Sequence, residues 1–269
     1  MAIFDVGVAV VTGAASGIGR ATAIAFARDG CKKIVLGDLS NAGMGETRQI
    51  MLAEFPDTAV ATRHLDVSDE ASVEDFYSFA VSEFGSIDYA ANIAGIAHEA
   101  RALHKTPDNV FDKVYAVNQR GAFLCEREVL RQMLTQPRRN GGIRGSIVVV
   151  TSQLAEMTTP NMTAYSATKA GVRGMCRSDA MDYGPEGIRI NTVGPGVTIT
   201  PLLLAAQEDK FIQSMARGTP LRRNALPEDI ANAIVWLSSS RASFITGVSL
   251  IVDGGMGLEV GPDEVLQAV

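Results

Sequence analysis

The chain of 269 residues holds only three cysteines and three histidines. Cys31, Cys125 and Cys176 lie far apart and form no CxxC pair, so we expect reduced, packed thiols rather than a disulfide framework or a redox motif. The histidines do not follow the spacing of metal ligands, and we expect each of them in a loop or at the surface. The sequence therefore predicts no metal site.

Long apolar runs and clusters of basic residues are also absent. No stretch approaches the ~18 apolar residues of a membrane-spanning helix, and the N-terminal "MAIFDVGVAVVTG" lacks the basic region of a secretory signal. A net charge of −6 and a pI near 5.2 disfavour nucleic acids and anionic membranes as partners. With 46% hydrophobic and 20% charged residues, the composition is globular. We expect a cytoplasmic enzyme or binding protein that acts on a small molecule.

Short β-branched runs alternate with longer amphipathic segments along the whole chain. This alternation predicts βαβ units and a parallel sheet. The fold class that follows is α/β, with residues 1–269 forming one doubly wound domain around a seven-stranded parallel sheet flanked by helices. The expected strands are 7–13, 32–38, 58–66, 86–95, 145–152, 188–196 and 249–255. The expected helices are 17–30, 41–55, 68–85 with Ser68 as its cap, 108–133, the helix that carries Tyr165, and 227–239.

A glycine-rich turn, "TGAASGIG", follows the first expected strand and precedes an amphipathic helix. Gly13, Gly17 and Gly19 give it the spacing TGxxxGxG. Glycines let the backbone bend tightly and approach a ligand. The helix that follows directs its free amides and the positive end of its dipole at the turn. The turn therefore predicts a site for a pyrophosphate.

Asp38 ends the second expected strand. An acidic side chain at this position can accept hydrogen bonds from the hydroxyls of an adenosine ribose and would repel a 2′-phosphate. The following "LSNAG" offers no cation, so the sequence favours NAD(H) over NADP(H). The alternatives are a helix cap or loop residue at Asp38, and an NADP(H) site in which Arg20 helps to hold the phosphate. Asp66, beside Val67, can reach the adenine amine, but turn chemistry explains it equally well.

Tyr165 and Lys169 stand four residues apart in "TAYSATKAG", so a helix places them on one face. An unperturbed tyrosine has a pKa near ~10. An adjacent ammonium and a cationic nicotinamide ring both favour the phenolate, which would suit Tyr165 to acid–base work. Alone, this pair is an ordinary helix pattern. The glycine turn and Ser152, at the end of the fifth expected strand where parallel sheets bind ligands, favour a catalytic role.

These motifs, taken in order, resemble the short-chain dehydrogenase/reductase family in its common single-domain type. The match runs from about residue 7 to residue 255. Ser152 precedes Tyr165 at the family's spacing, and "NIAG" resembles the family's NNAG, with Ile93 in place of its second asparagine. "PGVTIT" and "VDGG" resemble two further motifs of the family. The resemblance implies a Rossmann fold and an oxidoreductase that acts on a CH–OH group.

The resemblance also implies a role for each site residue. Tyr165 would exchange a proton with the substrate oxygen, and Ser152 would hold that oxygen. Lys169 would lower the tyrosine pKa and bind the nicotinamide ribose. Asn118 would hold a water that links Lys169 to solvent, while also satisfying the backbone at a helix kink. The residues expected at the dinucleotide are Gly13, Ser16, Gly17, Ile18, Gly19, Asp38, Asp66, Val67, Asn92 (through its backbone), Ala94, Tyr165, Lys169, Pro195, Gly196, Thr198 and Thr200.

The predicted function is hydride transfer between NAD(H) and a rather apolar secondary alcohol or ketone. The resemblance implies that residues at about 200–225 form a substrate lid, and residues at about 257–269 would form a tail. The apolar inner face of the lid would come from Leu202, Leu203, Leu204, Phe211, Ile212 and Met215. Small residues on the helix of Tyr165 suit close helix packing, and the resemblance implies a homotetramer or homodimer.

Two other functions remain open. The same fold could carry out a dehydration, epimerisation or cyclisation. A dinucleotide-sensing protein without turnover is also conceivable, although the intact set of Ser152, Tyr165 and Lys169 argues against it.

Overall fold

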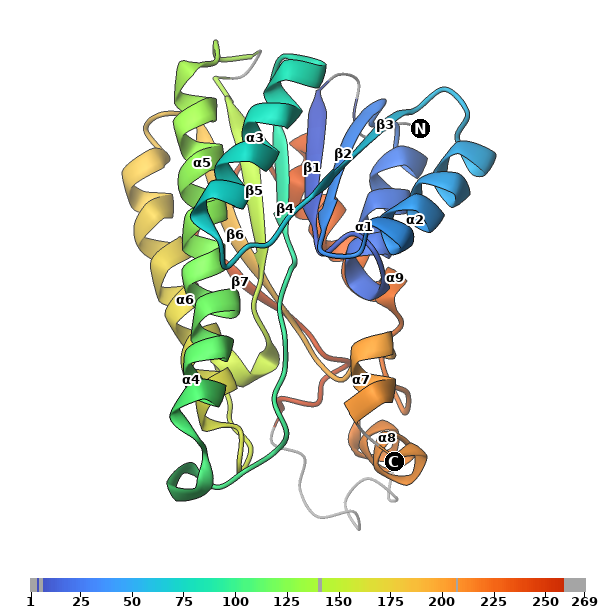
Figure 1. Cartoon of the computed structure of the whole chain (residues 1–269), viewed down its shortest axis with the longest axis vertical. Helices are drawn as coiled ribbons and strands as arrows, with labels where there is room; N and C mark the ends of the chain where they lie inside the picture. The colour runs from blue at the N-terminus through green and yellow to red at the C-terminus, as the bar shows by residue number, and fades with distance from the viewer. Residues whose placement is uncertain (1–3, 5–6, 140–141, 207, 259–269) are drawn as a thin grey trace.

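Seven strands form one parallel sheet in the computed structural model, which describes residues 4, 7–139, 142–206 and 208–258 (Figure 1). Their order is β3-β2-β1-β4-β5-β6-β7. The bounds are β1 Val8–Thr12, β2 Lys33–Asp38, β3 Ala59–His64, β4 Tyr89–Asn92, β5 Gly145–Val150, β6 Ile188–Pro195 and β7 Ser249–Val252. The chain adds strands on one side of β1 and then, from β4, on the other, so a topological switch point lies between β1 and β4. The predicted fold class and the seven parallel strands are confirmed.

Helices cover both faces of this sheet (Figure 1). Successive residues of a strand point to opposite faces. Accordingly, Ala9 and Val11 pack in a core with α1, α2 and α9, whereas Val8 and Val10 pack in a second core with α3, α5 and α6. The bounds are α1 Gly17–Arg28, α2 Asn41–Glu54, α3 Glu70–Phe84, α5 Gly121–Thr135, α6 Thr163–Tyr183 and α9 Pro227–Ser238.

The remaining helices lie beyond the carboxyl edge of the sheet, at the bottom of Figure 1. They are α4 Asp108–Tyr115, α7 Pro201–Ala206 and α8 Asp209–Gly218. Three short 3-10 helices are η1 Leu103–Lys105, η3 Gln153–Ala155 and η4 Ser240–Ala242. The helical region expected over 108–133 runs from α4 into α5 through a π turn, η2 Ala116–Arg120. Most of the expected tail lies outside the described residues.

The predicted cap of α3 was wrong by one residue. Asp69 caps this helix, because its Oδ1 accepts a hydrogen bond from the amide of Ala71 at 3.2 Å. The hydroxyl of Ser68 instead donates to Asp66 at 2.6 Å. Either residue type can cap a helix, so the sequence alone left the two positions equivalent.

The described residues can be compared with the requirements of a membrane-spanning helix and of a metal site. In this part of the chain no helix combines the length and apolar character that a bilayer crossing requires. Among the same residues, no three His, Cys, Asp or Glu side chains gather as a metal site would need. All three cysteines are free and buried.

Glu126 on α5 is a buried acid without a cationic partner in the described residues. Its side chain is 1% exposed. Its Oε2 accepts a hydrogen bond from Cys176 Sγ at 3.5 Å, and its Oε1 has no partner there. Burial, and secondarily the nearby Asp179, raises the pKa of Glu126 to about 8. The folded protein therefore holds a proton here that the unfolded chain releases at lower pH.

Replacing Glu126 with Gln should remove a pH-dependent loss of stability. Because the folded pKa lies above the unfolded value, the contribution of wild-type Glu126 is present at low pH and declines as the pH rises through about 8. We expect the free energy of unfolding of Glu126→Gln to rise relative to wild type by roughly 2–4 kcal/mol between pH 5 and pH 8. Urea unfolding at both pH values measures it. The control is Glu128→Gln, which removes a carboxylate that pairs with Arg127 and Arg131. If the free energy of unfolding of Glu126→Gln differs from that of wild type by the same amount at pH 5 and pH 8, the expectation is contradicted.

Candidate active site

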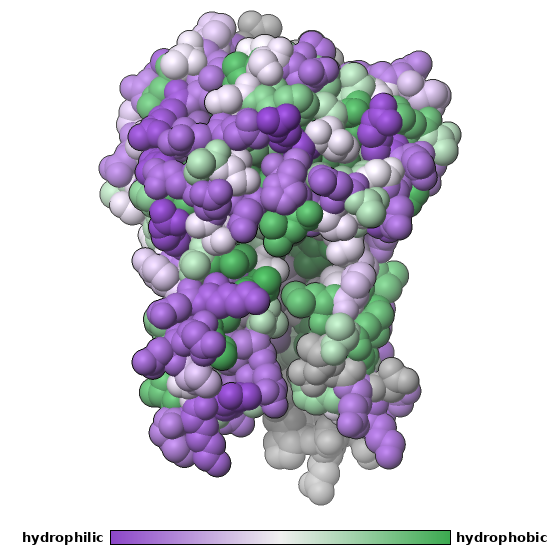
Figure 2. Space-filling model, viewed as in Figure 1, coloured by the Kyte–Doolittle hydropathy of each residue, from purple (hydrophilic) through white to green (hydrophobic). Residues whose placement is uncertain are grey.

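Two adjoining cavities lie at the carboxyl edge of the sheet. The larger, of about 490 Å³, is bordered by the glycine turn and by Asp38. The smaller, of about 280 Å³, is bordered by Ser152, Tyr165 and Lys169. Figure 2 shows the molecule hollowed below its middle, with hydrophobic residues gathered on the right of the hollow, in the region of α7. The cavities share walls, because both are lined by Ile18, Ile93, Gly95, Ile96, Thr200 and Leu202.

The glycine turn is fixed by backbone geometry. Gly17 has φ of +52°, a conformation that favours glycine. A Cβ atom at Gly19 would overlap the carbonyl oxygen of Gly13. Ser16 precedes α1 but makes no side-chain cap, so the first amides of this helix are not satisfied by it. The turn thus offers donors and a dipole end to an anion in the larger cavity.

Thr12 holds the switch point together. Its Oγ1 accepts hydrogen bonds from the amides of Ile93 and Ala94 at 3.0 and 3.2 Å, which fixes the segment after β4 against the end of β1. Ile93, which departs from the family's motif, lines both cavities. The side chain of Asn92 is buried and accepts from the Tyr77 hydroxyl at 3.1 Å. This side chain is therefore directed to α3, and it does not line either of these two cavities.

Asp38 lines the larger cavity, and its carboxylate is anchored by backbone amides. Oδ2 accepts from Ala15 at 3.1 Å, and Oδ1 accepts from Ser40 at 2.9 Å. Arg20 is bound within the protein. Its Nη2 donates to the Ala15 carbonyl at 2.6 Å and contacts the Glu46 carboxylate at 2.8 Å. The guanidinium is thereby held toward α2.

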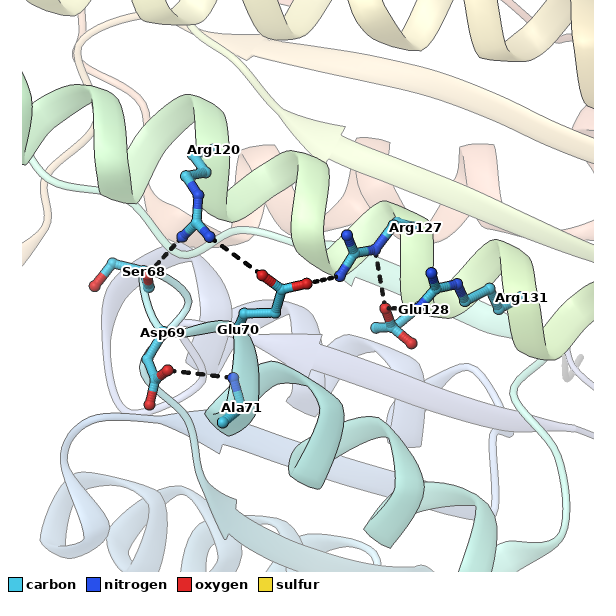
Figure 3. Close-up of polar contacts among 8 residues, drawn as sticks. All are labelled: Ser68, Asp69, Glu70, Ala71, Arg120, Arg127, Glu128 and Arg131. Carbon is cyan, nitrogen blue, oxygen red and sulfur yellow. Dashed lines mark hydrogen bonds and ion pairs between the residues drawn. The ribbon is translucent and has the colours of Figure 1, made fainter.

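Asp66 serves the turn after β3 and also lines the larger cavity, together with Val67. Its Oδ1 accepts hydrogen bonds from the amide and the hydroxyl of Ser68 at 2.9 and 2.6 Å. Figure 3 shows how charged side chains hold this turn. Arg120, from the π turn, donates to the Ser68 carbonyl at 2.9 Å and pairs with Glu70 at 3.3 Å. Arg127 of α5 also pairs with Glu70, at 2.6 Å.

Ser152, Tyr165 and Lys169 meet at the smaller cavity. Ser152 follows β5 and caps η3, where its Oγ accepts from the Leu154 amide at 3.1 Å. Tyr165 lies in the first turn of α6. Lys169 is 4% exposed, its Nζ lies 5.8 Å from the centre of the Tyr165 ring, and it donates to the Val150 carbonyl at 2.9 Å. This arrangement suits proton exchange with an oxygen bound between Ser152 and Tyr165.

Burial shifts the pKa of both Tyr165 and Lys169. Burial lowers the pKa of Lys169 to about 8. Burial also raises the pKa of Tyr165, and the Ser152 hydroxyl acts in the opposite direction. The expected lowering of the tyrosine pKa relies on the Lys169 ammonium together with a cationic nicotinamide ring, and the protein groups alone raise this pKa. Removal from water disfavours both the phenolate and the ammonium, and the ammonium is directed at the Val150 carbonyl.

Asn118 lies in the π turn and binds the backbone of one residue. Its Oδ1 accepts from the Ile96 amide at 2.8 Å, and its Nδ2 donates to the Ile96 carbonyl at 2.9 Å. A Cβ atom at Gly95 would lie 3.2 Å from Asn118 Oδ1 and 3.4 Å from Lys169 Nζ. Asn118 and Lys169 therefore converge on Gly95, and the side chain of Asn118 acts on the backbone.

The segment after β6 completes the smaller cavity. Pro195, Gly196, Thr198 and Thr200 all line it, and Thr198 donates to the Gly196 carbonyl at 3.0 Å. Several further residues here were not predicted as site residues. Thr12, within the quoted turn, has a positioning role, and Gly95, Ile96, His98 and Gln153 line the smaller cavity. Thr12 in the glycine turn, Gly95 in "NIAG" and Gln153 directly after Ser152 carried a positional signal, whereas Ile96 and His98 carried none.

Two residues of the expected apolar lid lie at the smaller cavity, and the lid itself stays a prediction. Leu202 and Leu203 of α7 line the smaller cavity, and Ile212 of α8 is buried. Leu204 and Phe211 line neither of the two cavities, so they do not belong to this inner face. A short helix turns only one of its faces to the cavity, and three consecutive leucines cannot all lie on that face.

Known proteins resemble this chain along nearly its whole length. The family model described as "Enoyl-(Acyl carrier protein) reductase" matches residues 13–257. A cis-4-hydroxycyclohexanecarboxylate dehydrogenase of Sinomonas cyclohexanicum is 40% identical over 248 residues, which cover 92% of this chain and 95% of that protein.

Solved structures agree with the sequence matches. Levodione reductase aligns with a TM-score of 0.89 at 34% identity, covering 94% of this chain and 98% of that one. A 3-ketoacyl-(acyl-carrier-protein) reductase from Brucella melitensis, complexed with NADH, aligns with a TM-score of 0.84 at 33% identity and the same coverage.

Two Gly→Ala variants separate a glycine that the turn requires from one that it does not. Because a Cβ atom at Gly19 would clash with the Gly13 carbonyl, we expect Gly19→Ala to lower the free energy of unfolding by ~2 kcal/mol or more. We also expect it to weaken NADH binding at least about tenfold. At Gly45 in α2 a Cβ meets nothing within 4 Å, so Gly45→Ala should stabilise by about 0.5–1 kcal/mol. Urea unfolding and NADH fluorescence titration measure both. Unchanged NADH affinity in a folded Gly19→Ala protein would contradict the assignment of the glycine turn to dinucleotide binding.

Proposed function

Because the chain belongs to the short-chain dehydrogenase/reductase family of oxidoreductases, which act on CH–OH groups, we propose that it transfers a hydride between NAD(H) and a rather apolar secondary alcohol or ketone. The observation that carries this proposal is the meeting of Ser152, Tyr165 and Lys169 at a cavity that shares its walls with the glycine-turn cavity. The tight turn that Gly19 permits, with the Gly13 carbonyl where a Cβ atom would stand, and the first amides of α1, which Ser16 does not cap, fit a pyrophosphate. The bound dinucleotide supplies or accepts the hydride.

The protein residues would manage the proton. In oxidation, Ser152 holds the substrate oxygen and Tyr165 takes its proton, and in reduction Tyr165 returns it. The ammonium of Lys169, held beside the ring by the Val150 carbonyl, stabilises the phenolate. The positive charge of an oxidised nicotinamide would add to this effect and offset the burial that raises the Tyr165 pKa. Asn118 holds the segment around Gly95 in place beside Lys169.

The surroundings of Asp38 support a preference for NAD(H) over NADP(H). Its carboxylate lines the larger cavity and would repel a 2′-phosphate. The alternative NADP(H) site needs a free cation at Arg20, but this guanidinium is held by Ala15, Glu46 and Thr47.

The walls of the smaller cavity support an apolar, ring-sized substrate. Its volume is about 280 Å³, and apolar side chains make up much of its lining, including Ile96, Leu154, Met162 and Leu203. The similarity to a dehydrogenase named for a hydroxycyclohexanecarboxylate supports a cyclic secondary alcohol.

Exposed apolar residues on α5 and α6 support a homotetramer or homodimer. Phe123 and Leu134 of α5 are 46% and 39% exposed, and Met181 of α6 is 80% exposed. An exposed apolar surface of this kind suits contact with another chain. A monomer-sized mass in light scattering at micromolar concentration would contradict this.

Asp38→Ala should relax the choice of dinucleotide. We expect wild type to bind NADH at least about tenfold more tightly than NADPH, and the variant to lose most of that ratio. Fluorescence titration with each dinucleotide measures it. Asp57→Ala, an exposed acid outside both cavities, controls for the change in net charge. Tighter binding of NADPH by wild type would refute the preference.

Tyr165→Phe should separate proton transfer from binding. Because the phenol hydroxyl is lost while the ring stays, we expect kcat for a secondary alcohol such as cyclohexanol to fall at least ~10²-fold. The Kd for NADH should stay within about twofold. Tyr183→Phe, at the end of the same helix and outside the smaller cavity, is the matched control. Turnover that survives in Tyr165→Phe would show that another group moves the proton.

A further inference from the structure

Two polar side chains in the wall of the smaller cavity each keep an atom without a hydrogen-bond partner. Oε1 of Gln153 and Nε2 of His98 are shielded from water, and no described residue binds either of them. Gln153 is 8% exposed, and both residues line the cavity. A buried polar atom without a partner costs stability. Two such atoms around one cavity indicate partners that the described chain does not supply.

Several other polar side chains of this cavity have their partners inside the protein. The hydroxyls of Thr151 and Thr198 donate to backbone carbonyls, and the hydroxyl of Thr200 accepts from the Leu203 amide. Ser152 and Lys169 belong to the proposed catalytic set. Gln153 and His98 are therefore the groups of the wall that are free to recognise a second polar group of a ligand.

The contacts of these two side chains show that both unpaired atoms are acceptors. Nε2 of Gln153 donates to Met256 Sδ at 3.3 Å. A thioether sulfur only accepts, so the amide nitrogen faces Met256 and the amide oxygen remains. Nδ1 of His98 lies 2.8 Å from the Glu99 carbonyl oxygen, which also only accepts. In the neutral ring, Nδ1 therefore carries the hydrogen and Nε2 the lone pair.

The two acceptors lie on opposite sides of Ser152: His98 on the side of β4, and the side chain of Gln153 on the side of β6 and β7. His98 comes from the segment after β4. Gln153 contacts Met256, after β7, and its Oε1 would lie 3.2 Å from a Cβ atom at Gly196, after β6. The order β4-β5-β6-β7 thus separates them. The terminal torsions of Gln and His side chains are broad, so a small rotation brings either acceptor to a ligand in the cavity.

Resting on the proposed function, we propose that Gln153 and His98 select a substrate with a second hydroxyl group besides the reacting one, that is, a diol. Ser152 and Tyr165 hold the reacting oxygen. The second hydroxyl donates to Gln153, next to Ser152, or to His98 across the cavity, according to its position on the carbon frame. An ether or a ketone at that position has no hydrogen to donate and leaves both acceptors unpaired.

The test compares each diol with its own monomethyl ether. The substrates are 1,2- and 1,4-cyclohexanediol, 2- and 4-methoxycyclohexanol, and cyclohexanol, each with NAD⁺ and the full-length protein. We expect kcat/KM for at least one diol to exceed that of its ether about tenfold or more. Gln153→Leu or His98→Leu should bring the ratio for that isomer close to one. Met162→Leu, an apolar change in the same wall, should keep the ratio. Thermal unfolding establishes that each variant is folded.

A binding measurement separates this inference from the proposed function. Calorimetric titration of the NADH-saturated protein with diol or ether needs no turnover. A preference for the diol in binding that Gln153→Leu or His98→Leu removes, without oxidation of any alcohol, would support the inference and contradict the proposed function. Oxidation of cyclohexanol with equal kcat/KM for every diol and its ether would overturn the inference and leave the proposed function standing. A diol preference that survives in both variants would also overturn it.

Discussion

The parallel direction of the strands is the constraint on which the site depends. Each strand of the described sheet ends at the same edge, so residues distant in sequence meet there. Asp38 ends β2, Ser152 follows β5, and Pro195 ends β6. Thr12 joins the two strands at the switch point by accepting hydrogen bonds from the segment after β4. Without this common edge, the glycine turn and the Tyr165 helix would have no shared cavity.

Several features of the site cost stability and keep side chains in place for chemistry. Lys169 is buried with a pKa lowered to about 8, and its ammonium is held by one backbone carbonyl. The π turn around Asn118 interrupts regular helix geometry, as such turns commonly do at functional sites. Gln153 and His98 keep unpaired atoms in the cavity wall. These costs concentrate at the carboxyl edge, whereas the two apolar cores on the sheet faces provide stability.

Much of the fold and the glycine-turn half of the candidate site could be predicted, because these features are local in sequence. The alternation of strands and helices, the glycine turn with Gly19 and the position of Asp38 at a strand end depend on residues close to one another. The pairing of Tyr165 with Lys169 on one helix face is also local. The seven strands expected from these local patterns all lie in the sheet of the structure.

Features that depend on distant contacts could not be predicted. The bonding of Asn118 to Ile96 and of Gln153 to Met256 joins segments that the sequence does not relate. The direction of the Tyr165 pKa follows from burial by the whole fold. Leu204 lines neither cavity, although its apolar side chain suggested a place on the inner face of the lid. These gaps concern the substrate side of the site, where tertiary packing decides which side chains face the cavity.

Transfer of deuterium tests the central claim most directly. The purified protein would be incubated with NAD⁺ and secondary alcohols carrying deuterium at the carbinol carbon, among them labelled cyclohexanol and cyclohexanediols. The nicotinamide product would then be analysed by NMR. Hydride transfer at the Tyr165 site predicts deuterium at C4 of the nicotinamide, on one face of the ring only. NADH binding with no deuterium transferred from any of these alcohols would contradict the account.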